Sequence, residues 1–339
     1  MSTLAIQICC FNEARTLPET LAALPSRVPG FERVIRVVVD DGSTDGTADL
    51  AKSLGVEVVV GGSGNRGLAR AFMAALEASI AAGADVIVHT DADNQYDAAS
   101  IPDLLRPIVE GRADIVVGAR PIATIEHFSF AKRLLQRLGS AVVRSLSGTR
   151  VDDAPSGFRA FTRDAALRLN VFNSFSYTLE TLIQAGRVGL RVASVPVGVN
   201  PPTRPSRLAR SSLHYVLRSS LAMAAAYIAY APVKFFGWLS IGFGLPAVVL
   251  AGRYVVLMAQ GAGKGHVQSV IVAASLGACA VFMLTIGAVA HLLSVNRRLL
   301  EEIRYLNRRR MSEAGPTLTV RAMSPEALGR PAVRPQDPR

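Results

Sequence analysis

Two long stretches in the last third of the chain are almost free of charge. Phe235 to Gly252 is 18 residues without a charged side chain, and Val267 to Asn296 is 30 residues in which His291 is the sole basic or acidic one. About 20 apolar residues cross the hydrocarbon core of a bilayer as a helix. The sequence therefore predicts two transmembrane helices, at residues 233–259 and 267–296.

Basic residues flank both ends of this predicted hairpin. Asn200 to Lys234 contains five basic residues and no acidic one, and Arg297 to Arg310 contains six arginines and two glutamates, while the connecting turn at residues 260–266 carries only Lys264. The positive-inside rule places such flanks in the cytoplasm. We expect a multi-pass protein of the cytoplasmic membrane whose N-terminal domain faces the cytoplasm, and the first residues lack the basic start of a signal peptide.

The net charge of +11 and the three cysteines restrict the partners and the cellular compartment that we expect for this protein. The positive charge lies beside the apolar stretches, where it suits an anionic membrane face, and aromatic residues are not interleaved with it as in a single-strand stacking platform. We expect no nucleic-acid partner. Cys9, Cys10 and Cys279 cannot form a secreted disulfide framework, which favours a reducing compartment.

Before about residue 200, apolar runs that are typical of strands alternate with helical patterns. The expected strands are Leu4–Cys10, Val34–Val39, Val56–Val60, Val86–Thr90, Ile115–Val117 and Val192–Val197. Helical spacing occurs over Leu68–Ala82 and Ile101–Glu110, and Ser43 or Thr44 is expected to cap a further helix that ends at Gly55. Strands this apolar indicate an α/β domain, with a mainly parallel sheet covered on both faces.

These patterns divide the chain into five segments. Residues 1–200 form the predicted domain, and residues 201–232 form a basic loop followed by a helix, Leu208–Tyr230, that suits the membrane interface or the surface of the domain. The two transmembrane helices follow. Residues 297–339 are expected to be a basic cytoplasmic segment with a disordered, proline-rich tail.

Acidic clusters follow three of the expected strands. Asp91-Ala92-Asp93-Asn94-Gln95 comes directly after Val86–Thr90, Asp40-Asp41 follows Val34–Val39, and Asn12-Glu13 follows the first strand. Ligands of open α/β sheets collect at the carboxyl ends of strands, and two carboxylates one residue apart can share a hard cation that bridges to phosphates. The alternative is a solvated acidic turn. We expect one shared crevice.

A competing motif is Gly62-Ser63-Gly64-Asn65-Arg66-Gly67, which matches the G-x-G-x-x-G fingerprint of dinucleotide-binding loops. It lies between a strand and a helix, as that fingerprint requires. It follows the third expected strand, however, and two carboxylates end the next strand where one ribose-binding acid is typical. A nicotinamide-dependent oxidoreductase thus remains an alternative.

Five motifs in order resemble those of the family-2 glycosyltransferases of GT-A fold, and within them the polyprenyl-phosphate glycosyltransferases of the dolichyl-phosphate mannose synthase type. The five are Phe11-Asn12-Glu13, Asp40–Thr47 (D-D-G-S-T-D-G-T), Asp91–Gln95 (D-A-D-N-Q), Gly118-Ala119-Arg120 and Ser156-Gly157-Phe158-Arg159. The resemblance covers Leu4 to about Leu208, and the hairpin matches the membrane-anchored members. Cys9-Cys10-Phe11 departs from the usual Pro-x-Tyr, and Arg207 replaces a common lysine, so the nucleotide base stays open.

The resemblance implies a role for each matching position. Mg²⁺ or Mn²⁺ would be held by Asp91, Asp93 and Gln95. The nucleotide sugar would be bound by Cys9, Phe11, Glu13, Asp40, Asp41, Asp91, Ala92, Asp93, Arg120 and Arg204. The acceptor phosphate would be bound by Ser156, Arg159 and Arg207. The expected catalytic residues are Asp93, Arg204 and Arg207, together with Asp153 and Glu180 as candidate groups that orient the acceptor or act as a base.

The implied reaction transfers a sugar, with inversion, from a nucleoside diphosphate to a membrane polyprenyl phosphate. A phosphate acceptor is already anionic near neutral pH and needs no strong base, whereas a hydroxyl lipid such as diacylglycerol, the close alternative, would need one. A non-catalytic protein that uses the basic membrane patch alone is a further alternative. The small residues of the two apolar helices make a homo-oligomer possible.

Overall fold

The computed structural model describes residues 2–121, 139–141, 143–145, 147–149, 151–171, 177–201, 225, 228, 230–261 and 267–313. The chain divides into two units. The first comprises Met1–Phe128, Arg150–Pro205 and Asn307–Arg339, and the second comprises Ser129–Thr149 and Ser206–Leu306.

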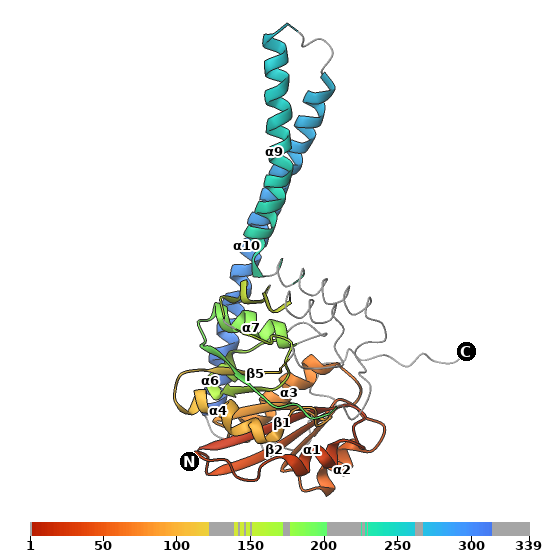
Figure 1. Cartoon of the computed structure of the whole chain (residues 1–339), viewed down its shortest axis with the longest axis vertical. Helices are drawn as coiled ribbons and strands as arrows, with labels where there is room; N and C mark the ends of the chain where they lie inside the picture. Colours follow the sequence, from red (N-terminus) through yellow and green to blue (C-terminus); the bar gives the residue numbers. More distant parts are fainter. Residues whose placement is uncertain are drawn as a thin grey trace, which may run out of the picture. The chain divides into compact units, whose positions relative to one another are not determined.

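A seven-stranded sheet organises the first unit (Figure 1). In chain order its strands are β1 (Thr3–Cys10), β2 (Arg33–Asp40), β3 (Val58–Gly61), β4 (Val86–Asp91), β5 (Ile115–Ala119), β6 (Arg159–Thr162) and β7 (Val192–Pro196). In space the order is β3-β2-β1-β4-β6-β5-β7, and β6 is antiparallel to both neighbours while the other pairs are parallel. The strands are rich in buried valine and isoleucine, which fit a pleated surface that is covered on both sides.

Helices cover both faces of this sheet. They are α1 (Leu17–Ala23), α2 (Thr47–Ser53), α3 (Leu68–Ala81), the short 3₁₀ helix η1 (Ala98–Ser100), α4 (Ile101–Val109), α6 (Arg163–Arg168) and α7 (Tyr177–Arg187). On one face, Leu4 and Ile6 of β1 pack with α4, and Ile8 and Cys10 pack with α1 and α2. On the other face, Val39 packs with α3, and Phe72 of α3 stacks on Tyr177 of α7 with ring centroids 4.0 Å apart.

The predicted fold class is confirmed, and the six expected strands are present with ends shifted by one or two residues. Elements β6, α1, η1 and α6 were not predicted from the sequence. The expectation that Ser43 or Thr44 caps α2 is wrong. The residue at the N-cap is Gly46, and Ser43 and Thr44 bond instead to the turns that end β1 and β2.

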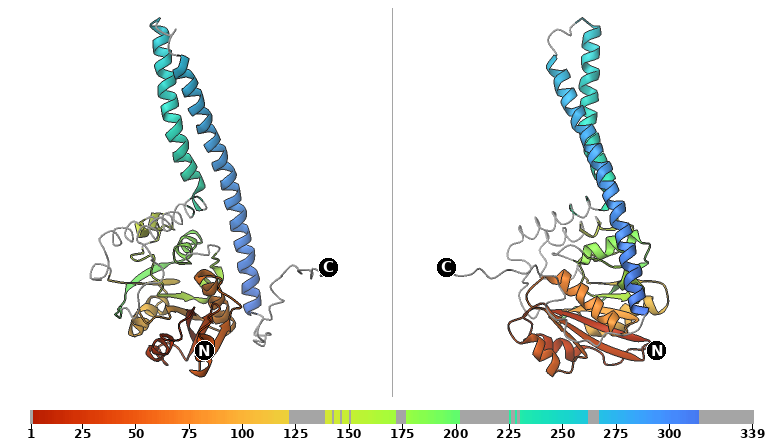
Figure 2. Two further views of the ribbon diagram at one scale, coloured as in Figure 1. Left: turned by 90° about the vertical axis from the view of Figure 1, so that its right-hand side faces the viewer. Right: turned by 180° about the vertical axis from the view of Figure 1, so that it is seen from behind.

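The second unit contains two long helices, α9 (Pro232–Ala259) and the greater part of α10 (Val267–Glu313), which lie side by side in both views of Figure 2. Their contact is close. Ser240 donates a hydrogen bond of 2.9 Å to the Ala280 carbonyl, and a Cβ at Gly287 would lie 3.0 Å from the Cβ of Phe236. Both helices are long and apolar enough to cross a membrane.

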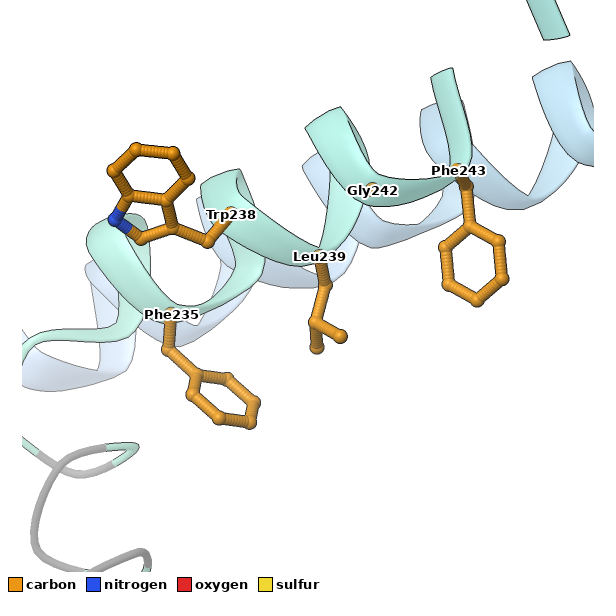
Figure 3. Close-up of a pocket in the computed structure, with 5 residues that line it drawn as sticks. All are labelled: Phe235, Trp238, Leu239, Gly242 and Phe243. Carbon is orange, nitrogen blue, oxygen red and sulfur yellow. The ribbon is translucent and has the colours of Figure 1, made fainter. Parts of the chain in front are cut away.

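The outer face of α9 is strongly apolar where the helix begins. Phe235, Leu239 and Phe243, at a spacing of four residues, point to one side, and together with Trp238 and Gly242 they line a shallow groove (Figure 3). Trp238 is 70% exposed and most of the large apolar residues that follow it along α9 are exposed as well. Exposed apolar area on this scale suits contact with lipid rather than with water.

Helix α10 is longer than the apolar stretch that predicts it. It continues for 17 residues beyond Asn296, through the arginine-rich segment, to Glu313. Arg308 near its end donates hydrogen bonds of 3.1 Å to the carbonyls of Leu167 and Leu169, which end α6 in the first unit. The expected interfacial helix and the expected disordered tail lie almost wholly outside the described residues.

Candidate functional site

The carboxyl ends of β2, β1 and β4 lie next to one another at one edge of the sheet. Strand register pairs Cys10 with Asp40 on one side, and Cys9 with Asp91 on the other. Neighbouring strands are only about 4.8 Å apart. The three polar turns that follow these strands are therefore brought together, as expected from the sequence.

The turns after β1 and β2 are joined by hydrogen bonds. Asn12 adopts a left-handed backbone with φ of 54°, accepts a bond of 2.8 Å from the Thr44 N–H, and donates its own N–H to Ser43 Oγ at 2.8 Å. The Glu13 N–H donates to Thr47 Oγ1 at 3.0 Å, and its buried carboxylate accepts from Thr16 Oγ1 at 2.8 Å. The Glu13 carboxylate is thus buried next to the start of α1, whereas Phe11 is 37% exposed.

Asp40 and Asp41 accept hydrogen bonds from different loops at this edge of the sheet. Asp40 accepts the hydroxyl and the N–H of Ser43, and so shapes its own turn. Asp41 accepts the N–H groups of Arg66 and Gly67 at 2.9 and 2.8 Å. A carboxylate of this chain therefore occupies backbone donors at the end of the glycine-rich loop, directly before α3.

This arrangement gives the glycine-rich loop a structural explanation. A Cβ at Gly42 would lie 2.5 Å from backbone atoms of Gly64, so the two loops pack backbone to backbone. In a dinucleotide-binding loop, the N–H groups at the helix start bind the pyrophosphate. Since Asp41 already binds two of these groups, the geometry weighs against the nicotinamide alternative.

The third turn begins with Asp91, whose side chain is 39% exposed at the end of β4. Asp93 Oδ1 accepts from the Gln95 N–H at 3.3 Å, and Asn94 between them has a left-handed φ of 55°. Asn200 holds this turn from outside: its N–H donates to the Gln95 carbonyl and its amide donates to the Asn94 carbonyl, both at 2.9 Å. Ala92 is buried, and its carbonyl accepts from Thr20.

Asp91 and Asp93 fit the oxygen chemistry of a divalent cation. Hard cations such as Mg²⁺ bind through one or two carboxylates and complete their shell with water and substrate phosphates. Across the part of the chain that the structure describes, no group of three or more histidine, cysteine, aspartate or glutamate side chains converges on one point. A site of this kind suits a cation that is shared with a diphosphate ligand.

Buried groups surround the inner side of Asp91. A Cβ at Gly157 would lie 3.2 and 3.3 Å from the two oxygens of Asp91 and 3.0 Å from the hydroxyl of Tyr177. The imidazole Nε2 of His89 lies 3.9 Å from Asp91 Oδ1. Burial, with a smaller contribution from the Arg159 charge, lowers the pKa of His89 to about 3, so the ring is uncharged. Burial also raises the pKa of Cys9 and of Tyr177, and both stay protonated.

Tyr96 joins the turn after β4 to the segment before β6. Its ring stacks on Phe158 with centroids 5.1 Å apart, and its hydroxyl accepts the Gly157 N–H at 2.9 Å. Ser156, fully buried, donates to the same hydroxyl at 3.5 Å. Ser156 thus lies behind the turn that follows β4, and its contact with the acceptor phosphate stays a prediction.

Arg120 and Asp153 form a bidentate ion pair. Arg120 Nε lies 2.7 Å from Asp153 Oδ2, and the second guanidinium nitrogen lies 3.1 Å from Oδ1. Burial on its own would lower the pKa of Arg120, but Tyr96, Asp153 and Asp91 outweigh it and raise the pKa, so the guanidinium stays charged. Asp153 is 1% exposed, and both its oxygens bind Arg120. It orients an arginine near Asp91 and is not placed as an exposed base.

Arg159, which the resemblance assigns to the acceptor phosphate, is fully buried. Its three nitrogens donate to the Ser156 carbonyl at 2.9 Å, the Ala154 carbonyl at 2.6 Å and Thr181 Oγ1 at 2.7 Å. Burial lowers its pKa to about 10. Arg159 therefore fixes the 154–157 segment, whose Gly157 packs on Asp91, and its contact with an acceptor phosphate stays a prediction.

Of the remaining expected site residues, Glu180 lies in α7 and is buried. Arg204 and Arg207 lie outside the described residues. No role in the site was assigned from the sequence to His89, Tyr96, Gly157 or Tyr177. For two of them the sequence offers a positional signal, because His89 precedes Asp91 by two residues and Tyr96 follows Gln95 directly.

Comparison with known proteins identifies the family. Residues 5–169 match the family described as Glycosyl transferase family 2. An uncharacterized glycosyltransferase of Mycobacterium bovis is 35% identical over 197 residues, which cover 57% of this chain and 84% of that protein. The chain belongs to glycosyl transferase family 2. The enzyme is thus a glycosyltransferase, as the five motifs indicate.

This family-2 glycosyltransferase is also similar to a curated mannosyltransferase and to a solved structure. An undecaprenyl-phosphate mannosyltransferase of Micrococcus luteus is 29% identical over 197 residues, which cover 55% of this chain and 79% of that protein. A crystal structure of glucosyl-3-phosphoglycerate synthase from Mycobacterium tuberculosis, in complex with Mn²⁺, UDP-glucose and phosphoglyceric acid, covers 66% of this chain and 80% of its own, with TM-score 0.50 and 22% identity. This likeness confirms the GT-A fold.

Proposed function

We propose that this glycosyltransferase transfers a sugar from a nucleoside diphosphate to the phosphate of a polyprenyl carrier in the membrane. The observation that carries the proposal is the register of β2, β1 and β4, which brings Asp40, Asp41, Asp91 and Asp93 to one sheet edge. The relatives support the acceptor class: besides the Micrococcus luteus enzyme, a polyprenol monophosphomannose synthase of Mycolicibacterium smegmatis is 27% identical over 198 residues.

The donor would lie along this edge. We assign its nucleoside to the turns that carry Phe11, Glu13 and Asp41. The Asp41 oxygens keep lone pairs beyond those that accept from Arg66 and Gly67. Asp91, Asp93 and Gln95 would hold Mg²⁺ or Mn²⁺, which, when bound, offsets the negative charge of the diphosphate. Mn²⁺ is present in the solved structural neighbour.

Arg120 would stabilise the leaving diphosphate. Its guanidinium is charged, only 18% exposed, and fixed in place by both oxygens of Asp153. A preorganised charge in a partly desolvated position stabilises developing negative charge without reorganisation during the reaction. As the bond from the anomeric carbon to the donor oxygen breaks, an acceptor phosphate oxygen bonds to that carbon from the opposite face, so an α-linked donor gives a β-linked product.

Arg204 is proposed to bring the acceptor phosphate to the donor. Asn200 is bonded to the Gln95 and Asn94 carbonyls, and Arg204 follows four residues later. Arg207 is proposed for the same acceptor phosphate.

Two observations favour a phosphate acceptor over a hydroxyl lipid. A hydroxyl group needs a general base with access to the acceptor. Of the two carboxylates expected for that task, Asp153 is bound by Arg120 and Glu180 is buried in α7. A phosphate acceptor makes no such demand. The apolar helices α9 and α10 would hold the enzyme at the membrane, with the catalytic domain on the cytoplasmic side.

The test uses the purified full-length protein in liposomes that contain a polyprenyl phosphate or diacylglycerol. A panel of sugar nucleotides is added with Mn²⁺, and new glycolipids are detected by mass. We expect a product with polyprenyl phosphate, and a loss of about 10²–10³ in rate for Asp93→Ala. Asp103→Ala, which removes an exposed carboxylate of α4, serves as the control. A product formed on diacylglycerol alone would overturn the acceptor assignment.

A further inference from the structure

A chain of buried polar groups runs behind Asp91. Ser79 of α3 donates its hydroxyl to Gln7 Oε1 at 3.1 Å, and Gln7 Nε2 lies 3.3 Å from His89 Nδ1. All three side chains are completely buried. The chain passes from α3 through β1 to β4, and ends two residues before Asp91.

The direction of these hydrogen bonds fixes the form of the imidazole. The amide nitrogen of Gln7 has only hydrogens to offer, so His89 Nδ1 is the acceptor. A ring that accepts at Nδ1 carries its only N–H on Nε2. The other end of the amide is occupied as well, because Gln7 Oε1 accepts from the Ser79 hydroxyl and the Nε2 end faces His89.

The nearest acceptor that the structure identifies for the His89 Nε2 hydrogen is the Asp91 carboxylate. Among the residues described, Nε2 is buried without a hydrogen-bond partner, and Asp91 Oδ1 lies 3.9 Å away. The ring edge contacts of Phe72 and Tyr177, with centroids 5.2 and 5.3 Å from that of His89, hold the imidazole in this orientation. Buried donors in native proteins are almost always paired, so an orphaned one requires an explanation, and the Asp91 carboxylate is the nearby acceptor that the structure offers.

We propose that His89 is a positioning residue for Asp91: its Nε2–H binds Asp91 Oδ1 when the donor binds, and Oδ2 is thereby aimed at the cation and the donor. This inference rests on the proposed function. A half-exposed carboxylate closes a gap of about 1 Å by a small rotation, and catalytic hydrogen bonds are often long before ligand binding. Gly157 leaves the space in which that rotation occurs.

The first experiment observes the tautomer directly. The full-length protein is labelled with ¹⁵N-histidine, and the His89 resonances are identified among the five histidines by their loss in His89→Gln. We expect a neutral ring with its hydrogen on Nε2 and an acceptor Nδ1, and a change of the Nε2 shift on addition of Mn²⁺ with UDP or GDP. A hydrogen on Nδ1 would overturn the proposal.

The second experiment measures Mn²⁺ affinity by electron paramagnetic resonance, with UDP or GDP present. His89→Leu removes the donor and should weaken Mn²⁺ binding at least tenfold, and should raise the Mn²⁺ concentration for half-maximal rate while kcat at saturating Mn²⁺ changes less than threefold. His89→Gln keeps an N–H of similar reach and should restore the affinity to within threefold of the wild type.

Gln184→Leu is the matched control, because Gln184 is also a buried amide but bonds to Asn170. If His89→Leu does not fold, Gln7→Leu takes its place, since it frees Nδ1 and should also weaken Mn²⁺ binding. Equal Mn²⁺ affinity in the leucine variant and the wild type would overturn the positioning role. Wild-type protein that binds no Mn²⁺ with either nucleotide would instead contradict the proposed function.

Discussion

Gly157 is the residue at which the smallest change would disturb the site most. A Cβ there would lie 3.0 Å from the Tyr177 hydroxyl and 3.2 Å from Asp91 Oδ2. We predict that Gly157→Ala lowers the transfer rate by about 10–100-fold, because the methyl group displaces the carboxylate, and that it costs about 1–3 kcal/mol of stability through overpacking. Both are measured, by a glycolipid assay and by thermal unfolding in detergent.

Gly61→Ala is the control for this substitution. Gly61 ends β3, has no left-handed φ, and has no atom within 4 Å of where its Cβ would be. It should retain nearly full activity. A Gly157→Ala enzyme that is as active as Gly61→Ala would contradict the tight packing around Asp91.

Single residues also show what sequence reasoning can and cannot reach. The location of Asp91 and Asp93 was predictable, because an apolar strand followed by a D-x-D motif places carboxylates at a sheet edge. The burial of Arg159 was not, because arginine is rarely buried and its partners include carbonyls that exist only after the 154–157 segment has folded. The pairing of Asp153 was not predictable for the same reason, since its partner Arg120 is 33 residues away.

The loops at the sheet edge are elements whose stability depends on glycine. Gly42 and Gly46 have almost equal left-handed φ, +79° and +81°, but a Cβ at Gly42 would lie 2.5 Å from Gly64 while one at Gly46 meets nothing within 4 Å. We predict that Gly46→Ala costs about 1–2 kcal/mol, the left-handed strain alone. Gly42→Ala should cost at least about 3 kcal/mol, since overpacking is added. Unfolding of the two variants under one condition tests the difference.

Asp114, just before β5, and Arg191, just before β7, form an ion pair, called here the Asp114–Arg191 clip, that should make the stability of the protein depend on pH. Arg191 donates to both Asp114 oxygens, at 2.8 and 3.0 Å, and its hydrogen bonds hold the pKa of Asp114 below the usual value near 4. A lowered folded-state pKa stabilises the protein above the unfolded value, and that contribution disappears as the pH falls through the folded value.

We therefore predict that Asp114→Asn lowers the melting temperature by about 1–3 °C at pH 7, because a partly exposed ion pair contributes little. The difference from the wild type should shrink as the pH falls below about 4, through the lowered pKa of Asp114. A difference that stays constant as the pH falls would show that the charge is not what stabilises the Asp114–Arg191 clip.

Among elements, long and strongly patterned ones were predictable and short ones were not. Residues Ile101, Leu104, Leu105 and Ile108 follow helical spacing, and α4 has almost the expected bounds. The four residues of β6 are too few to show alternation, and their strand exists because β4 and β5 pair with it on both sides. The start of α2 was misplaced because Ser43 and Thr44 bond to Asn12, 31 and 32 residues away.

On the scale of the whole molecule, the two apolar helices should matter more for the lipid than for the donor. We predict that deleting residues 233–296 raises the KM for a long-chain polyprenyl phosphate in liposomes at least tenfold. The KM for the sugar nucleotide should change less than threefold, because the donor edge is built by β1, β2 and β4. A short-chain, water-soluble polyprenyl phosphate is the control acceptor, and its KM should change little. Equal loss with both acceptors would contradict the membrane role.

Helix α10 is much longer than the predicted helix at residues 267–296. Its 47 residues extend about 70 Å, more than twice the thickness of a hydrocarbon core. Hydropathy predicts only the apolar part. The rest is helical because glutamates and arginines pair four residues apart, as Arg297 does with Glu301, and because Arg308 binds the carbonyls that end α6.

The position of β6 has a consequence for how the chain is made. Because residues 159–162 pair with both β4 and β5, a ribosome must synthesise about half of the protein before these two strands can join one sheet. Until then the nascent chain presents bare strand edges, which invite pairing with other chains. The carboxylates at the end of β4 are translated before Gly157 and Tyr177, which lie behind Asp91. Synthesis therefore leaves this sheet edge unfinished until β6 is inserted.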